Sequence, residues 1–176
     1  YKCYNLCIKL RDGQAGAPDA GRGKFMDETN KLANTRVKAR DFVFGLLFAK
    51  AFAPDEAADS FYAAEIENAE ADFGDQSDYI RRAFFGVTDN ISDLDSKISN
   101  AAVGWSLSRL SKASLTIMRL CVYEMANIDD VPKRVALNEA VELAKRYDDE
   151  SAPAFVNGVL NTISRSLPDR ECDNRL

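Results

Sequence analysis

Three basic residues at the start of the first convincing helix offer the clearest chemistry in this sequence, which is contact with an anion. Arg36 and Arg40 are one turn apart and project from the same face, and Lys38 can reach around on its long stem. Cations at a helix N-terminus oppose the macrodipole, at about 0.3–1 kcal/mol each when exposed. This placement mildly favours an anionic partner, although on composition alone a solvated basic turn is the commoner explanation.

Catalytic chemistry is poorly represented. The chain has no histidine, which removes the commonest general base, the serine and cysteine triads and most catalytic zinc sites. Its four cysteines form no Cys-x-x-Cys pair and fit no zinc ribbon; they are Cys3, Cys7, Cys121 and Cys172. We therefore expect no enzymatic activity, no metal and no cofactor, and a reducing, cytoplasmic location.

The N-terminal segment contains an imitation of a phosphate-binding loop at residues 16–24. Arg22, where that loop needs lysine, follows Gly21, and no apolar strand precedes the segment. A flexible Gly/Ala/Pro tail is the simpler interpretation. Because apolar periodicity is poor and Met26 is an alternative start, we expect residues 1–33 to be a disordered extension.

The net charge of −5 over 176 residues argues against a general polyanion binder, because nonspecific affinity for nucleic acid is mostly electrostatic. The charge is unevenly distributed. Residues 31–50 carry five basic residues and one acidic residue, whereas residues 53–103 carry three basic and twelve acidic residues. The first helix is thus a basic island on an acidic protein. No apolar run approaches the roughly 18 residues of a membrane span, so no membrane association is expected.

These side chains must be positioned by helices. From Thr35 onwards apolar residues recur at helical spacing, and no segment alternates as a strand would. The expected helices cover about 36–51, a segment beginning at Pro54, one unbroken run from Ile80 to Ala101, a segment capped by Ser111, 133–147, and a segment capped by Ser151 and ended by Pro168. The pattern predicts an all-α helical bundle of about six to seven helices.

A few polar and aromatic residues interrupt this pattern. We expect Arg119, in the most apolar helix, to bind a carboxylate or carbonyl. Asn138 and Asn157 are expected to make buried hydrogen bonds between elements. Trp105 is interpreted as a core or hinge aromatic.

Several segments, in order and at the right spacing from about residue 35 to 167, resemble the NusB transcription antitermination family. They are Thr35–Asp41, Trp105–Leu110, Ile117–Leu120 with Tyr123 and Glu124, Val131–Lys145, and Phe155–Leu160. Linked motifs of this length are far more specific than one short pattern. The resemblance implies two small helical bundles, which we place at 34–103 and 104–168, with a flexible polar tail at 169–176.

The resemblance also implies a function. Members of the family bind single-stranded boxA RNA together with NusE, a small-subunit ribosomal protein. The resulting complex, with RNA polymerase and other Nus factors, suppresses termination during rRNA synthesis. Some relatives self-associate, so a homodimer is one expected outcome.

The resemblance assigns RNA-binding roles to individual positions. The expected residues are Arg36, Lys38, Arg40, Phe48, Lys112, Ser151 and Phe155. Val37 stands where many members are basic, so the basic cluster is thinner here. Core packing is the alternative for Phe48 and Phe155, and helix capping is the alternative for Ser151.

Two other functions remain open. A protein-only interaction module, with RNA binding weak or lost, would follow if the thinner basic cluster no longer holds RNA. A NusB-like domain also precedes the catalytic half of some rRNA cytosine methyltransferases, but the chain ends at Leu176 without a methyl-donor domain. The favoured hypothesis is a non-enzymatic RNA-binding antitermination factor.

Overall fold

The computed structural model describes residues 35–69 and 73–175, and this part of the chain contains seven α-helices, three short 3-10 helices and no strand. The all-α prediction is therefore confirmed. The expected extension at residues 1–33 lies outside the described residues. The chain divides into two compact units between Phe84 and Phe85, inside helix α5 rather than after residue 103.

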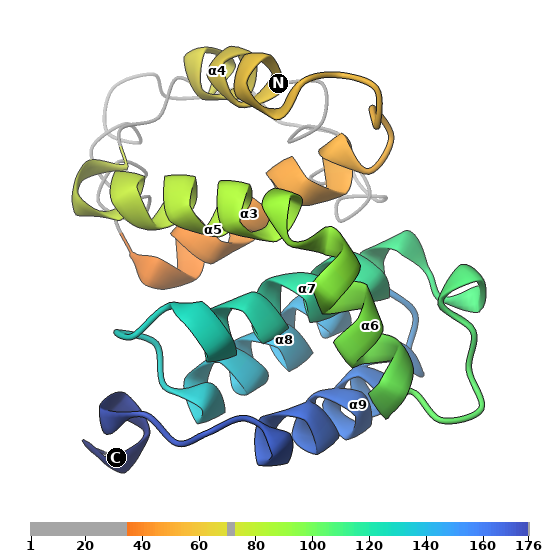
Figure 1. Ribbon diagram of the computed structural model, residues 1–176. Coiled ribbons are helices and arrows are strands. Elements are labelled where there is room, and N and C mark those ends of the chain that lie inside the picture. The colour runs from red at the N-terminus through yellow and green to blue at the C-terminus, as the bar shows by residue number, and fades with distance from the viewer. Residues whose placement is uncertain (1–34, 70–72, 176) are drawn as a thin grey trace, which may run out of the picture. The chain divides into compact units, whose positions relative to one another are not determined.

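The first unit contains α3 (Arg36–Lys50), α4 (Ala58–Asn68), the 3-10 helix η1 (Gly74–Gln76) and the first part of α5 (Ser77–Asp89) (Figure 1). Thr35 caps α3 as expected, because its hydroxyl oxygen accepts the N–H of Lys38 at 3.4 Å. Helix α3 is buried along most of its length, with Val43 and Phe44 in the core.

The second helix begins at Ala58, so the expected start at Pro54 is wrong. The reason is the preceding turn. The Lys50 ammonium donates to the carbonyls of Ala53 at 2.7 Å and Pro54 at 3.1 Å, which holds residues 53–54 against the end of α3. A cation at the last helical turn is favourable, so this closure competes with a helix start.

The second unit contains α6 (Ile91–Ala101), η2 (Leu107–Arg109), α7 (Lys112–Asn127), α8 (Lys133–Tyr147), α9 (Ala152–Ser166) and η3 (Glu171–Arg175). Helix α7 is central, as its apolar circumference predicts: it packs against α6, α8 and α9. Its N-cap Ser111 accepts the N–H of Ser114 at 2.9 Å. Since α6 packs on α7 and α9, it belongs to this unit.

The heptad-like run from Ile80 to Ala101 is not one helix, because it breaks at Asn90. Asn90 leaves the helical conformation, and its amide nitrogen donates to the carbonyl of Gly86 at 2.8 Å. Asparagine competes for backbone groups in this way, which favours helix ends. Leu94 and Ile98 are still buried, but Ile91 is exposed.

Arg119 confirms its expected role inside this unit. Its guanidinium donates to both carboxylate oxygens of Asp95, at 2.7 Å each, and so joins α7 to α6. The paired geometry is that of a bidentate salt bridge. Arg119 is therefore engaged structurally.

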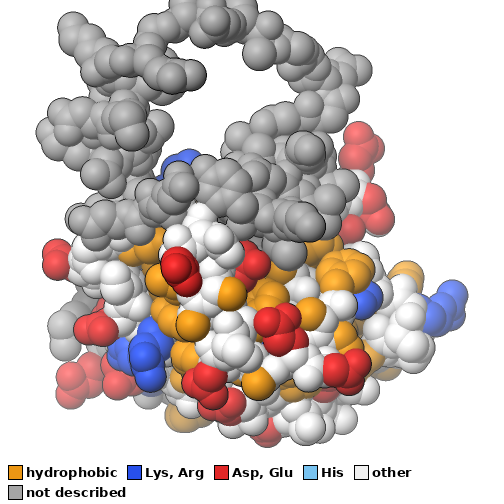
Figure 2. All heavy atoms as spheres, turned by 90° about the horizontal axis from the view of Figure 1, so that it is seen from above, with side chains coloured by type: hydrophobic (Ala, Val, Ile, Leu, Met, Phe, Trp, Pro, Cys, Tyr) orange, Lys and Arg blue, Asp and Glu red, His pale blue; other side chains and the backbone are white. Residues whose placement is uncertain are grey.

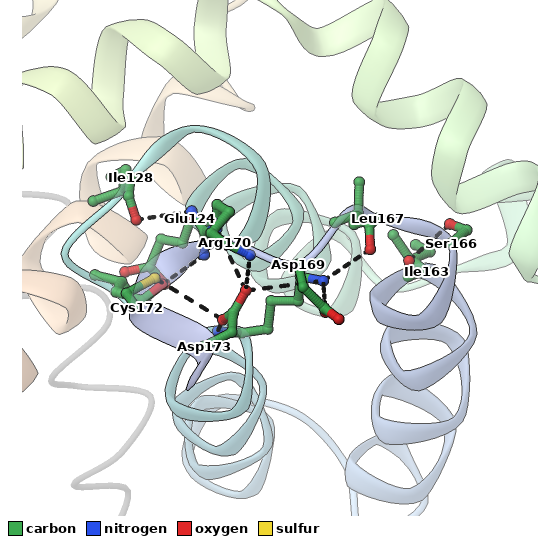
Figure 3. Close-up of polar contacts among 11 residues, drawn as sticks. Glu124, Ile128, Ile163, Ser166, Leu167, Asp169, Arg170, Cys172 and Asp173 are labelled. Atoms are coloured by element: carbon green, nitrogen blue, oxygen red, sulfur yellow. Dashed lines mark hydrogen bonds and ion pairs between the residues drawn. The ribbon is translucent and has the colours of Figure 1, made fainter. Parts of the chain in front are cut away.

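The C-terminal residues do not form the expected flexible tail (Figure 3). After Pro168 the chain turns into η3 and returns to the loop between α7 and α8. Arg170 donates to the carbonyls of Glu124, Ile128 and Val131 at 3.2, 3.0 and 2.7 Å. Asp173 accepts the backbone N–H of Lys133 at 2.7 Å. These polar residues look like a solvated tail in the sequence, but they satisfy the end of α7 and the start of α8.

Candidate nucleic-acid interface

Arg36 is held in a fixed orientation by the start of α5 and the residue before it. Its Nε donates to the side-chain oxygen of Gln76 at 2.6 Å, and its guanidinium carbon lies 4.2 Å from the centre of the Tyr79 ring. A guanidinium stacked on an aromatic ring loses little further entropy when it meets a phosphate. The orientation of the half-buried Arg36 is thus set by Gln76 and Tyr79.

Arg40 does not face solvent. Its side chain is 2% exposed, and its guanidinium carbon lies 6.0 Å from the same Tyr79 ring. Arg40 stands one turn before Phe44 and two turns before Leu47, both of which are buried, so it continues the core face of α3. In this arrangement the Arg40 side chain is buried, whereas Lys38 is exposed.

Phe48 lies at the C-terminal half of α3 in a row of aromatic rings. Its ring centre is 5.7 Å from that of Phe44, which is buried, and 5.2 Å from that of Phe52, which is 59% exposed. Phe48 is itself half-buried. It therefore packs in the core on one side and reaches the surface on the other, and both of its expected roles remain compatible with this position.

In the second unit Phe155, an expected RNA contact, lies beside Trp105. The rings of Phe155 and Trp105 are 5.2 Å apart with an interplanar angle of 55°, and Phe155 is half-buried. Trp105 is 50% exposed, so of its two interpretations, core or hinge aromatic, the first is wrong and the second stays a prediction. The guanidinium carbon of Arg109 lies 5.8 Å from the Trp105 ring centre. This cluster joins the loop after α6 to the first turn of α9.

Lys112 is the exposed first residue of α7. The carboxylate of Asp148 lies at the same helix end, where it accepts hydrogen bonds from the hydroxyls of Ser111 and Ser114 at 2.5 Å. An acid at a helix N-terminus complements the macrodipole. Asp148 already places a negative charge at this end of α7. A phosphate would therefore have to be bound by the Lys112 ammonium and not by the N-terminal end of the helix.

Ser151 occupies the N-cap position of α9 as expected, but its side chain makes no capping hydrogen bond, and the Asp149 carboxylate accepts the backbone donors instead. One Asp149 oxygen accepts the hydroxyl of Ser151 at 2.6 Å and the backbone N–H groups of Ser151 and Ala152 at 2.9 and 3.0 Å. These hydrogen bonds hold the pKa of the Asp149 carboxyl below its ordinary value, and the bond from the Ser151 hydroxyl contributes most. Ser151 remains exposed and so remains available as a contact.

We predict that Asp149→Ala lowers the melting temperature more than Ser151→Ala, because only the first change removes the acceptor of both backbone donors. The lowered pKa means that this contribution is present near neutral pH and is lost as the carboxylate is protonated in acid. Thermal unfolding followed by circular dichroism, from about pH 7 to about pH 3, measures both effects. Equal melting temperatures for the two variants at neutral pH would contradict the assignment.

Other polar positions differ from expectation. Asn138 and Asn157 are exposed, so neither makes the buried hydrogen bond between elements that we predicted. The side chain of Asn157 instead accepts from Asn161 at 2.9 Å, one turn along the same helix. A polar residue in an apolar helix indicates burial only where the residue falls on the core face.

On the face that Figure 2 shows, the Asp and Glu side chains are spread among exposed apolar atoms. Among the described residues no group of acidic or cysteine side chains is arranged to hold a metal ion, and no helix is long and apolar enough to cross a membrane.

Sequence reasoning missed Trp105, Arg109 and Asp149 as site residues. A signal existed for two of them, because residues 98–123 contain no acidic residue and carry Arg109 close to the only tryptophan of the chain. An aromatic residue near basic residues in such a segment is a common feature of single-stranded nucleic-acid binders.

Comparison with known proteins gives one consistent result. A model described as the NusB family matches residues 34–165. The transcription antitermination protein NusB of Lachnoclostridium phytofermentans is 36% identical over 129 residues, which is 73% of this chain and 98% of that protein. The NusB protein of Clostridium perfringens is 35% identical over 133 residues, which is 75% of this chain and 98% of the relative.

Solved structures agree. The structure of T. maritima NusB has a TM-score of 0.70 and 35% identity, and covers 77% of this chain and 94% of its own. The crystal structure of the antitermination factors NusB and NusE in complex with dsRNA contains a chain with a TM-score of 0.66 and 27% identity. That match covers 74% of this chain and 96% of the solved one.

Proposed function

The chain belongs to the NusB family of non-enzymatic antitermination factors, and from this premise we propose that it binds boxA RNA together with NusE to support rRNA transcription. The match over residues 34–165 carries the proposal, since it includes both the basic start of α3 and the Phe155 segment. By the same reasoning the protein would act in the cytoplasm, in a complex with RNA polymerase and other Nus factors.

The described geometry supports RNA binding in three ways. Arg36 is stacked on Tyr79 and hydrogen-bonded to Gln76, which prearranges one cation. Lys38 presents a second cation at the surface. Phe155 contributes an aromatic ring that is half-exposed beside Trp105. Cations bind the phosphates of the RNA, and aromatic rings stack on its unpaired bases, which a charge alone does not contact.

The form of the RNA is part of the proposal. The solved complex of relatives contains dsRNA, whereas our sequence reasoning expects a single strand. Exposed aromatic rings favour the single strand, because bases within a duplex are already stacked on one another.

The direct test is a fluorescence anisotropy titration of labelled boxA RNA with the full chain, with and without NusE. We expect saturable binding that is tighter with NusE and weaker for a scrambled single strand or for a duplex of the same sequence. Absence of sequence-dependent binding even with NusE would refute the RNA proposal. Light scattering on the same samples determines whether the chain is a monomer or a homodimer.

The burial of Arg40 favours a second candidate, a protein-only interaction module. With Arg40 in the core and Val37 uncharged, the α3 cluster presents fewer cations than its sequence predicts. Fewer phosphate contacts weaken binding and flatten its salt dependence. This candidate predicts NusE binding without any preference for boxA RNA, and the titration above distinguishes the two.

A further inference from the structure

Trp105 is an exposed tryptophan in the connection between α6 and α7. Figure 1 shows the path of that connection. Gly104, with φ of +83°, allows the sharp turn that precedes Trp105, and the backbone N–H of Trp105 donates to the carbonyl of Ala102 at 3.0 Å. The indole is thus presented by a defined turn followed at once by η2. Half of its surface remains open to solvent.

The neighbours of the indole hold it without covering it. Phe155 meets the ring at an angle of 55°, and the Arg109 guanidinium carbon lies 5.8 Å from the ring centre. A tryptophan used only for packing would be expected to bury most of its large apolar surface. An indole oriented by a second aromatic ring and an arginine, with open surface left, has the composition of a base-stacking site.

The charge around the indole has one sign along the chain. Residues 98–123 carry Arg109, Lys112 and Arg119 and no acidic residue, in a protein with 28 acidic residues. Arg119 is paired with Asp95 at 2.7 Å, and the side chains of Arg109 and Lys112 are exposed. A guanidinium beside an exposed aromatic ring favours a polyanion that also carries flat, apolar groups.

We propose that Trp105 and Arg109, together with Phe155, form a stacking platform for an unpaired base of the bound RNA. The proposal deepens the proposed function and rests on it. The base stacks on the open surface of the indole, and Arg109 contributes both its cation and its planar group to the same contact. The site recognises a nucleobase, not merely a phosphate.

The chain provides its own reporter for this contact, because Trp105 is its only tryptophan. We expect a short single-stranded RNA carrying a boxA sequence to quench the tryptophan fluorescence in parallel with binding. Inorganic polyphosphate, which supplies the charges without bases, should leave the emission unchanged. RNA binding that leaves the emission unchanged, or quenching by polyphosphate equal to that by RNA, would overturn the platform.

Substitutions at Trp105 and at a nearby exposed residue test whether the aromatic ring itself contributes to RNA binding. Trp105→Ala should weaken boxA binding about tenfold, whereas Trp105→Phe, which keeps a stacking ring, should retain most of the affinity. Val103→Ala is the matched control, since Val103 is 86% exposed two residues away and has no aromatic surface. Circular dichroism establishes that each variant is folded.

The outcomes distinguish the platform from the function on which it rests. If wild-type chain fails to bind RNA at all, the proposed function falls and the platform with it. If wild-type chain binds RNA and Trp105→Ala binds equally well, only the platform falls. Loss of NusE binding in Trp105→Ala with unchanged RNA binding would identify the same surface as a protein contact and would also overturn the platform.

Discussion

Replacing Asp173 by Ala is expected to lower the free energy of unfolding by about 2–4 kcal/mol. The Asp173 carboxylate is 12% exposed. It accepts the backbone N–H groups of Lys133 and Arg170 at 2.7 and 3.0 Å and lies 3.9 Å from the Lys133 ammonium. Removing it leaves two backbone donors and a nearly buried cation with fewer acceptors (Figure 3).

Asp169 provides a matched control for this prediction. Its carboxylate contacts the same Lys133 ammonium, at 2.9 Å, but is 81% exposed. An exposed ion pair contributes at most about 1 kcal/mol, so Asp169→Ala should cost far less than Asp173→Ala. Asp173→Asn, which keeps one acceptor oxygen, should lower the free energy of unfolding by an amount between those of the two alanine variants. Urea unfolding followed by circular dichroism measures the series, and equal midpoints for Asp169→Ala and Asp173→Ala would contradict the prediction.

The contribution of Asp173 also depends on pH. Burial by itself raises the pKa of the Asp173 carboxyl, but the N–H groups of Lys133 and Arg170 and the charges of both residues outweigh it, and the pKa is lowered. A lowered pKa stabilises the folded state at pH values above the unfolded pKa, and that stability is lost as the pH falls through the folded pKa. The difference in the free energy of unfolding between wild type and Asp173→Ala should therefore become smaller as the pH is lowered.

Local signals in the sequence predicted much of the fold. The helix at 133–147 has the bounds expected from its apolar period and the preceding Pro132, and Thr35 and Ser111 cap α3 and α7 as predicted. The break at Asn90 was missed because the apolar positions on both sides keep the spacing of a single helix. Periodicity reports which face is apolar, and it is insensitive to one residue that leaves the helix.

The candidate site was less predictable, because exposure is a tertiary property. The spacing of Arg36 and Arg40 placed them correctly on one face of α3, yet Arg40 is buried and Arg36 is only half-buried. Trp105 shows the opposite error, since it was interpreted as a core or hinge aromatic and its side chain is half exposed after the turn at Gly104. The capping side chain of α9 differed for a similar reason: Ser151 and Asp149 both suit a helix start, and the loop geometry selects Asp149.

The second large effect is expected in RNA binding. The double variant Arg36→Ala, Lys38→Ala should weaken boxA binding by roughly 10- to 100-fold at low salt, because each change removes a cation that binds phosphate. For a single strand, the slope of log affinity against log salt concentration should also become shallower by about 0.7 for each phosphate that the variant no longer neutralises. Anisotropy titrations at several salt concentrations measure both quantities.

Single changes assign the weaker binding to charge or to geometry. Lys38→Ala removes an exposed charge, so it should flatten the salt slope. Arg36→Lys keeps the charge but loses the planar group that stacks on Tyr79 and donates to Gln76, so it should weaken binding while retaining the slope. Arg40 is unsuitable for this comparison, because truncating a buried arginine would disturb the core of α3.

Lys145→Ala is the control for Lys38→Ala, because each removes one charge from an exposed lysine; Lys145 lies near the end of α8 and is paired with Glu142 at 2.6 Å. If the basic residues of α3 bind phosphate directly, Lys38→Ala should lose much more affinity than Lys145→Ala. Equal, small losses would mean that the RNA senses only the total charge of the protein. If NusE binding also stays intact, that result would favour the protein-only module. The basic residues of α3 would then have no specific RNA ligand.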